Sequence, residues 1–314
     1  MGGTKYANAV AAVKAMENFL LTRSDLDQLI SAATAAEMES LISARRGSGN
    51  EELTLEGVWE MIRGYAPDCD ELKILLYKND FHNLKAVLKS MLSGRDPKSC
   101  CIRPTNLDLD LLVKAFSSKE FDLLPDYISS TAEQAYELIT RTLDGQLADS
   151  LIDSACMSTM QKAAEESGSS FMVSYARLIT ACADIKTAYR CAKMNKQRSF
   201  LETAVCGSPE LDKESLIRAA LGGTDSVLAL LETTSFDEGG RLLSQSPAAF
   251  EKWCDDMIME LAQTARMQAF GAEPLAAYYL AAEAELKNLR MIRVCRESGT
   301  DRETIKERMR KLYV

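Results

Sequence analysis

The sequence contains few of the residues that interrupt helices or serve as catalytic bases. Of its 314 residues, 16 are glycine, 7 are proline and 1 is histidine. Scarce glycine and proline argue against the turn-rich pattern of an all-β protein. A Cys-His or Ser-His nucleophile system would have to use the single histidine. The composition therefore predicts an all-α protein with little or no strand.

Charge and hydropathy restrict the classes of partner. The net charge is −9 and the pI is about 5.0. This argues against nucleic acid or an anionic lipid surface as the main partner, because both require a basic footprint. No run of about 18 apolar residues occurs, so we expect no segment that crosses a bilayer. Near the start, Lys5, Lys14 and Glu17 interrupt the apolar residues and predict an amphipathic helix, not a signal peptide. Any membrane role would then go through a partner protein.

The sequence repeats itself. The segment 80–85 (DFHNLK) returns as 184–189 (DIKTAY) and again as 285–290 (ELKNLR). Downstream, Leu107-Asp108 returns as Leu211-Asp212 at the same offset as the first two segments. Thr300-Asp301 begins the corresponding stretch of the third copy. Three related units of roughly a hundred residues predict one pseudo-threefold object.

The matched residues end near Ser117-Ser118 and again near Gly222-Gly223, where turn-forming residues gather. The first unit holds an additional helix, at about 5–21, which has no counterpart in the others. We expect this helix to pack near the C-terminus and close the ring of units. The predicted helical repeats are 1–117, 118–222 and 223–314.

Local signals predict several helix starts. Ser130 to Glu133 and Thr300 to Glu303 match the capping box, in which a hydroxyl and a carboxylate pair the first amides of a helix. Ser208-Pro209 and Ser246-Pro247 place proline at the first helical position. The clearest helix is 274–297. Residues at 3–4 spacing predict its buried stripe: Leu275, Tyr279, Ala282, Leu286, Leu289 and Ile292.

The opposite faces of helix 274–297 are charged. Glu283 and Lys287 lie one turn apart in the favourable order. Arg290, Arg293 and Arg296 make the C-terminal half cationic. This charge has two explanations, namely a solvated face that complements the helix dipole and a face that binds a partner.

Motifs for catalysis, nucleotides and metals are missing from the sequence. The lone histidine, His82, occupies a slot that holds Lys186 and Lys287 in the other copies, which predicts a polar surface residue and not a base. No Walker or G-x-G-x-x-G motif provides a phosphate cradle. The nine cysteines form no C-x-x-C pair and no zinc spacing, and they suggest a reducing compartment. We therefore expect no catalytic residue, cofactor or metal.

The segments 273–290 (EPLAAYYLAAEAELKNLR) and 305–314 (IKERMRKLYV) resemble the end of the C subunit of bacterial and archaeal A/V-type ATPases. That C subunit is related to the d subunit of the eukaryotic V-ATPase. The segment 80–85 resembles the first-unit motif of the same family, and length and repeat spacing agree across essentially the whole chain. The middle copy departs most, because Thr187 and Tyr189 stand where the other copies have asparagine and a basic residue.

The resemblance implies a funnel-shaped, all-helical, three-lobed protein, peripheral at the cytoplasmic face of the membrane. In that family the protein sits on the ring of c (proteolipid) subunits and receives the lower end of the central stalk in its cavity. It has no catalytic activity. It passes torque between the ATP-hydrolysing or ATP-synthesising head and the ion-transporting ring.

We expect residues that line the cavity or the interfaces between lobes, and so bind partners, among seven polar residues, most of which recur at equivalent places. These residues are Asn83, Lys85, Lys186, Lys287, Asn288, Arg290 and Arg293. The alternative is that they only hydrogen-bond neighbouring segments within each lobe. For the whole chain, two other functions stay open, namely a generic helical-repeat adaptor that binds another helical protein and an enzyme that uses His82 or an exposed thiol.

Overall fold

A computed structural model describes residues 6–46 and 53–314. The described residues form sixteen α-helices and three short 3-10 helices. In these ranges the strand-like pairing is confined to an isolated bridge between Ser208 and Leu211. The prediction of an all-α fold is confirmed.

Backbone contacts divide the chain into two compact units. The first consists of residues 1–72 and 245–314, and the second of residues 73–244. This grouping follows spatial contacts, whereas the repeats 1–117, 118–222 and 223–314 follow sequence similarity. The three-repeat division stays a prediction.

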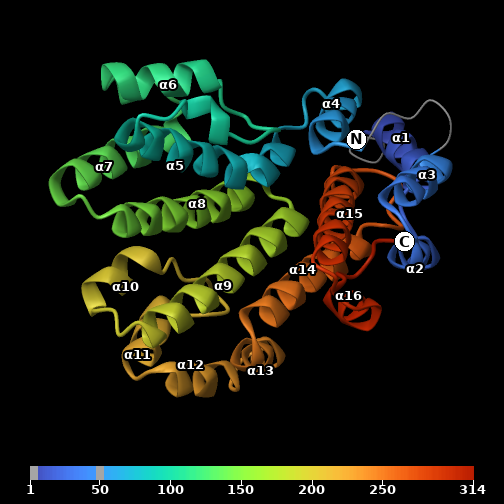
Figure 1. The fold of residues 1–314 in the computed structure, drawn as a ribbon. Coiled ribbons are helices and arrows are strands. Elements are labelled where there is room, and N and C mark those ends of the chain that lie inside the picture. The colour runs from blue at the N-terminus through green and yellow to red at the C-terminus, as the bar shows by residue number, and fades with distance from the viewer. Residues whose placement is uncertain (1–5, 47–52) are drawn as a thin grey trace. The chain divides into compact units, whose positions relative to one another are not determined.

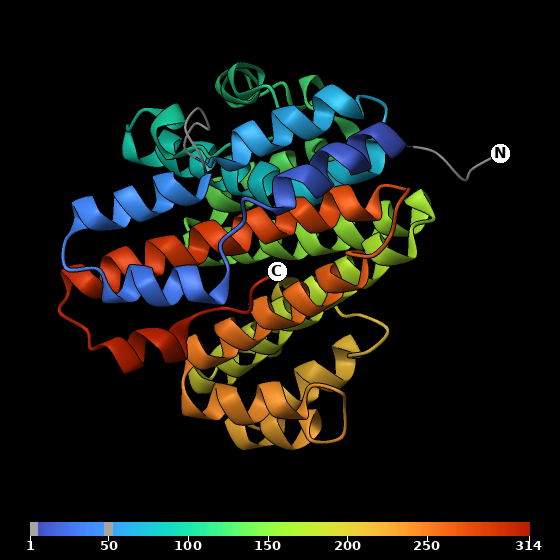
Figure 2. The same cartoon turned by 90° about the vertical axis from the view of Figure 1, so that its right-hand side faces the viewer.

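The first unit is built around its longest helix, α15. Helices α1, α4, α14 and α16 all pack against α15, and α2 packs against α3 and α16. Figure 2 shows α15 (red) among the N-terminal helices (blue) and beside α14 (orange). The elements of this unit are α1 (Ala7–Glu17), α2 (Arg23–Ser31), α3 (Ala35–Arg46), α4 (Leu55–Tyr65), α14 (Pro247–Thr264), α15 (Glu273–Glu297) and α16 (Arg302–Arg308), with a 3-10 helix (Asp70–Leu76) leading into the second unit.

The additional N-terminal helix, α1, lies near the C-terminus as expected. The Tyr313 hydroxyl donates a hydrogen bond to Glu17 Oε1 at 3.2 Å. The Lys14 ammonium donates to the backbone carbonyl of Arg266, in the α14–α15 connection. These contacts join the two ends of the chain within one unit. The expected closure of a ring of repeats stays a prediction.

The second unit is a succession of packed helices (Figure 1). Helix α5 packs against α6 and α8, α8 against α7 and α9, and α9 against α11 and α12. Phe81, Phe116 and Tyr175 are among its fully buried side chains. Its elements are α5 (Tyr77–Ser93), α6 (Leu109–Ser118), α7 (Asp126–Thr142), α8 (Gly145–Ser167), α9 (Ser170–Lys193), α10 (Arg198–Ala204), α11 (Lys213–Leu221), α12 (Thr224–Leu231) and α13 (Asp237–Gln245), with 3-10 helices at Pro97–Cys100 and Phe121–Leu123.

Three aspartates that correspond in the repeats begin three helices in the same way. Asp108, Asp212 and Asp301 cap α6, α11 and α16, and each side chain accepts a hydrogen bond from a backbone N–H of the first turn. Such a cap stabilises a helix by about 1 kcal/mol. The prediction for Ser246-Pro247 is also confirmed, because Ser246 caps α14 and Pro247 is its first residue.

Two predicted helix starts are wrong, and a third is displaced by one residue. Ser130 to Glu133 lies inside α7, which already begins at Asp126 after Pro125. The capping-box pattern fails there because Thr131 and Ala132 face the core as part of a longer helix. At Ser208-Pro209 no helix begins: Ser208 forms an isolated bridge with Leu211, and the next helix begins only at Lys213.

The displaced start is that of α16. The capping box predicted at Thr300 to Glu303 would make Thr300 the N-cap, but the N-cap of α16 is Asp301, which accepts from the N–H of Thr304.

Candidate functional site

Two of the predicted partner-binding residues are fully buried asparagines. Asn83 on α5 donates from Nδ2 to the carbonyl of Ile102 at 3.0 Å and accepts from its N–H at 2.7 Å. Asn288 on α15 makes the same pair with Arg310, at 3.2 Å and 2.9 Å. Both side chains have an exposed fraction of 0%. They brace connecting segments within their own unit and present no atom to a partner in this conformation.

The acid that opens each repeated segment is also buried. Asp80 accepts hydrogen bonds from the N–H of Asn106 at 2.8 Å and from the Tyr127 hydroxyl at 2.9 Å. Asp184 accepts from the N–H groups of Cys206 at 3.0 Å and Gly207 at 2.6 Å. Burial raises the pKa of Asp80 and raises that of Asp184 to about 6. Sequence reasoning found this recurring acid but assigned it no role.

The third copy of this acid, Glu285, holds a different segment. It accepts from the N–H of Leu21 at 2.7 Å and forms an ion pair with Arg46 at 3.0 Å. Its side chain is 3% exposed, and burial raises its pKa despite the arginine. In the third copy the acid therefore anchors the N-terminal segment instead of the connection that follows its own helix.

Two of the predicted partner-binding residues, Lys85 and Lys186, are lysines of the second unit, and both lie at or near the surface. Lys85 forms an ion pair with Asp153 of α8 at 2.5 Å, and its side chain is 23% exposed. It lines a pocket of about 350 Å³ on α5, together with His82 and Arg95. His82 is exposed and lies 3.2 Å from the carbonyl oxygen of Cys100, as expected for a polar surface residue. Lys186 is exposed on α9.

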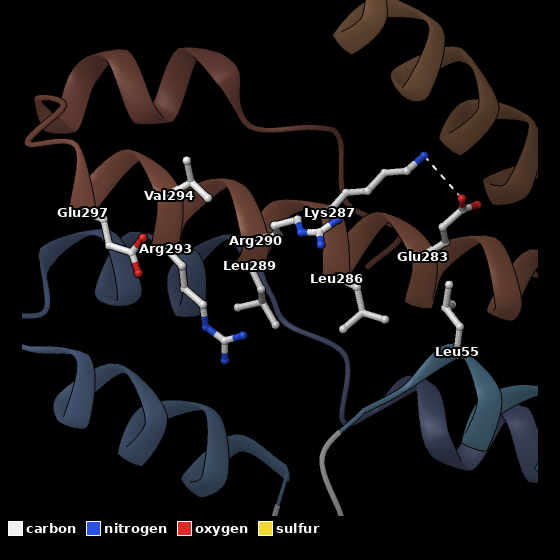
Figure 3. A pocket seen from close by; sticks show the side chains of 9 residues that line it. All are labelled: Leu55, Glu283, Leu286, Lys287, Leu289, Arg290, Arg293, Val294 and Glu297. Atoms are coloured by element: carbon white, nitrogen blue, oxygen red, sulfur yellow. Dashed lines mark ion pairs between the residues drawn. The ribbon is translucent and has the colours of Figure 1, made fainter. Parts of the chain in front are cut away.

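The remaining three predicted residues meet in a groove of about 560 Å³ along α15 (Figure 3). We call it the α15 groove. The predicted pair is confirmed, because Lys287 lies 3.5 Å from Glu283, and it also pairs with Asp255 at 2.9 Å. The residues that line the groove are Leu55, Glu283, Leu286, Lys287, Leu289, Arg290, Arg293, Val294 and Glu297.

The two arginines of the groove differ in their pairing. Arg293 forms an ion pair with Glu39 of α3 at 2.7 Å. Arg290 is exposed, and Figure 3 draws no ion pair between it and another residue that lines the groove. One turn further along, in the last turn of α15, Val294 is 56% exposed. Arg290, Val294 and Glu297 are therefore the side chains of the groove that are most available to another molecule.

Three leucines line the groove, and none was predicted as a site residue; Leu289 is buried, as its place in the predicted stripe requires. Leu286 was assigned to the buried stripe of α15, but it is only half-buried and faces the groove. Leu55 begins α4, far from α15 in sequence, and no local signal connects the two. The other expected stripe residues, including Tyr279 and Ile292, are buried.

Two kinds of feature are absent from the described residues. Within 6–46 and 53–314, no three histidine, cysteine or acidic side chains come together as a metal site. In the same ranges no helix combines the length and apolarity needed to span a membrane. All nine cysteines are free thiols.

Comparison with known proteins identifies the family. A family model described as "ATP synthase (C/AC39) subunit" matches residues 9–308. The chain is similar to the C subunit of the V-type sodium ATPase of Enterococcus hirae, with 25% identity over 263 residues that cover 82% of this chain and 79% of the relative. The protein therefore belongs to the ATP synthase (C/AC39) subunit family, whose members are non-catalytic subunits of V-type ATPases and ATP synthases.

Proposed function

We propose that this chain is a rotor component that couples the central stalk of an A/V-type ATPase to the membrane ring of c (proteolipid) subunits. The match of the family model over residues 9–308 carries the proposal. In this role the chain is a funnel-shaped, pseudo-threefold socket that transmits torque for ion transport or ATP synthesis. It is held at the cytoplasmic face of the membrane through the complex.

The physical requirement for this role is a stiff body with polar surfaces for its partners. Close-packed helical cores resist deformation. The proposed partner surface consists of Lys85, Lys186, Lys287, Arg290 and Arg293. Asn83 and Asn288 support it from inside by fixing the segments that follow α5 and α15. Because Lys85, Lys287 and Arg293 have carboxylate partners within the chain, the charge of Arg290 is more available to a partner than theirs.

The test is reconstitution of the chain's own ATPase with and without this protein. We expect the chain to co-purify with both the stalk and the ring. We also expect ATP-driven uptake of ions to require the chain, and uptake is measured for sodium and for protons. ATP hydrolysis by the detached head should continue without it. Ion uptake at the full rate in its absence would overturn the proposal, and binding to an unrelated helical protein alone would favour the adaptor function.

The proposed surface is tested by replacing Lys85 and Arg290 together with glutamate. We expect the assembled complex to lose its stalk more readily, while the far-ultraviolet circular dichroism of the chain stays unchanged. Unchanged retention of the stalk together with unchanged stability would exclude these residues from the partner surface.

A further inference from the structure

The segment that follows α16 is held in place by side chains. We call residues 310–314 the strap, and Figure 2 shows this part of the chain, marked C, beside α14 and α15. The strap is not helical, and among the described residues no backbone group hydrogen-bonds to its backbone. Its first contact is the paired hydrogen bond between the Asn288 carboxamide and the backbone of Arg310. The strap therefore lies on its unit in the way that a bound peptide does.

Helix α14 continues the recognition of the strap backbone. Asp256 accepts a hydrogen bond from the N–H of Lys311 at 2.6 Å, and Gln263 donates to the carbonyl of Leu312 at 2.8 Å. These two α14 side chains lie two helical turns apart, and so on one face of the helix. One row of side chains therefore satisfies backbone groups of neighbouring strap residues.

The charges of the strap match those of α14. Arg310 pairs with Asp255 at 2.8 Å, and Lys311 pairs with Glu260 at 2.9 Å. Although burial opposes it, Lys287 and Arg310 hold the pKa of Asp255 below its usual value. Two successive basic side chains therefore meet acids on neighbouring turns of one helix, and these contacts favour basic residues at both positions.

The next specific contact is to an aromatic ring. Tyr313 is 3% exposed, and its hydroxyl donates to Glu17 of α1 at 3.2 Å. The guanidinium of Arg266 lies 5.8 Å from the ring centroid of Tyr313 and donates to its carbonyl at 3.4 Å. A guanidinium at this distance from a ring makes a cation–π contact. These contacts therefore favour tyrosine, after one position that is only half-buried.

Hydrogen bonds to the backbone give affinity in peptide recognition, and contacts to the side chains give specificity. The strap has both kinds of contact. Within it only Tyr313 is buried, and segments with few buried apolar contacts open locally at a low cost in free energy. A site that holds such a segment is available to a competing segment whenever its own is released.

We propose that the residues around the strap form a peptide-binding site, which the chain's own strap closes. We call it the strap site, and its polar residues are Asp255, Asp256, Glu260, Gln263, Arg266 and Asn288. When the strap is released, the site accepts a non-helical segment of another protein with the same chemistry. That segment has two successive basic residues, one further residue and then a tyrosine. This inference goes beyond the proposed function and does not depend on it.

The test uses the full-length chain and a fluorescent peptide with the sequence of residues 309–314 (MRKLYV). Fluorescence anisotropy measures binding of the peptide. An open variant, Arg310→Glu with Lys311→Glu, keeps every residue of the strap site but repels the strap from its acids. We expect this variant to bind the peptide at least about tenfold more tightly than the wild type does. In the wild type the strap occupies the site at an effective concentration on the order of mM.

A groove-independent control shows whether the peptide binds at the strap site. Adding Glu260→Lys to the open variant should weaken binding about tenfold, because it removes the partner of the second basic residue. The matched control adds Glu137→Lys on α7 instead, because Glu137 is 52% exposed and Glu260 is 50% exposed. This control should bind the peptide as the open variant does. A peptide with glutamate at both basic positions should bind at least about tenfold more weakly.

Three outcomes overturn the proposal. They are a folded open variant that binds no peptide, a wild type that binds it as tightly as the open variant, and equal binding with and without Glu260→Lys. The single variant Lys311→Glu keeps the test decisive if the open variant does not fold, because it changes a side chain that is 43% exposed. We expect it to bind the peptide about threefold more tightly than the wild type, since an exposed ion pair contributes little. Binding equal to that of the wild type would overturn the proposal as well.

Discussion

Asn83 of α5 and Asn288 of α15 make the same two hydrogen bonds, although they lie in different units of the chain. Each carboxamide donates to the carbonyl and accepts from the N–H of one residue in a following segment, Ile102 or Arg310. A side-chain amide that hydrogen-bonds both the N–H and the carbonyl of one residue takes the place of the backbone partners which those two groups would otherwise need. The recurrence of asparagine in these repeats therefore reflects a structural requirement.

Replacing either asparagine with leucine should destabilise its unit. The substitution keeps the volume but leaves the N–H and carbonyl of Ile102 or Arg310 without their partner. We expect the free energy of unfolding to fall by about 2 kcal/mol for Asn83→Leu and for Asn288→Leu, measured by urea denaturation. Lys162→Ala, at a side chain that is 78% exposed, is the control and should change it by less than about 0.5 kcal/mol. A loss no larger than that of the control would show that these bonds contribute little.

The buried ion pair between Arg46 and Glu285 should be strongly coupled. Their side chains are 8% and 3% exposed. Removing one partner leaves the other charge buried, so Arg46→Met and Glu285→Gln should each lower the free energy of unfolding by about 3 kcal/mol. The double variant should recover part of this loss, which a double-mutant cycle measures. Strictly additive losses would contradict the coupling. The exposed pair Arg141–Glu137 is the control and should contribute less than about 0.5 kcal/mol.

The helical fold was predictable because its signals are local. The aspartates at 108, 212 and 301 cap helices through bonds to residues two or three positions away, so their pattern is visible in the sequence. Ser130 to Glu133 matches a local capping pattern too, but the helix start predicted there is wrong. Thr131 is buried inside α7, which continues through this segment. A local pattern is compatible with a helix start, but tertiary packing determines whether a helix starts there.

The candidate site was only partly predictable. Lys287, Arg290 and Arg293 follow from the charge pattern of one helix, and they do line one groove. Asn83 and Asn288 share the same recurrence but are buried, because repetition marks structural and functional residues alike. Leu55 enters the groove only through the packing of α4 on α15. That contact between distant segments has no signature in the sequence.

Asp184 should make the stability of the second unit depend on pH. Burial raises its pKa from 3.8 to about 6, although two N–H donors oppose the shift. The folded state therefore binds a proton more tightly than the unfolded state, so stability is gained as pH falls from about 6 to about 4 and lost as it rises. The full difference is about 3 kcal/mol.

The non-titrating variant Asp184→Asn isolates this contribution. We expect the free energy of unfolding of the wild type, relative to Asp184→Asn, to increase by about 2 kcal/mol between pH 7 and pH 4, and to reach the full difference only below the unfolded pKa of 3.8. Asp122→Asn, at an exposed position, should keep the wild-type pH dependence. A constant difference between the wild type and Asp184→Asn would mean that the pKa of this carboxyl is not raised by burial.

Gly207 should tolerate alanine less well than Gly168, although both have positive φ angles. At Gly207, φ is +87° and an added Cβ would lie 2.9 Å from Lys213 Cβ, whereas at Gly168, φ is +70° and nothing lies within 4 Å. Backbone strain alone should lower the free energy of unfolding by about 1 kcal/mol in Gly168→Ala. Gly207→Ala adds the collision and displaces the N–H that donates to Asp184, so we expect about 2–3 kcal/mol. Urea denaturation of both variants measures the difference. Equal losses would mean that the 205–207 turn moves freely away from Lys213, and that Asp184 does not hold it in place.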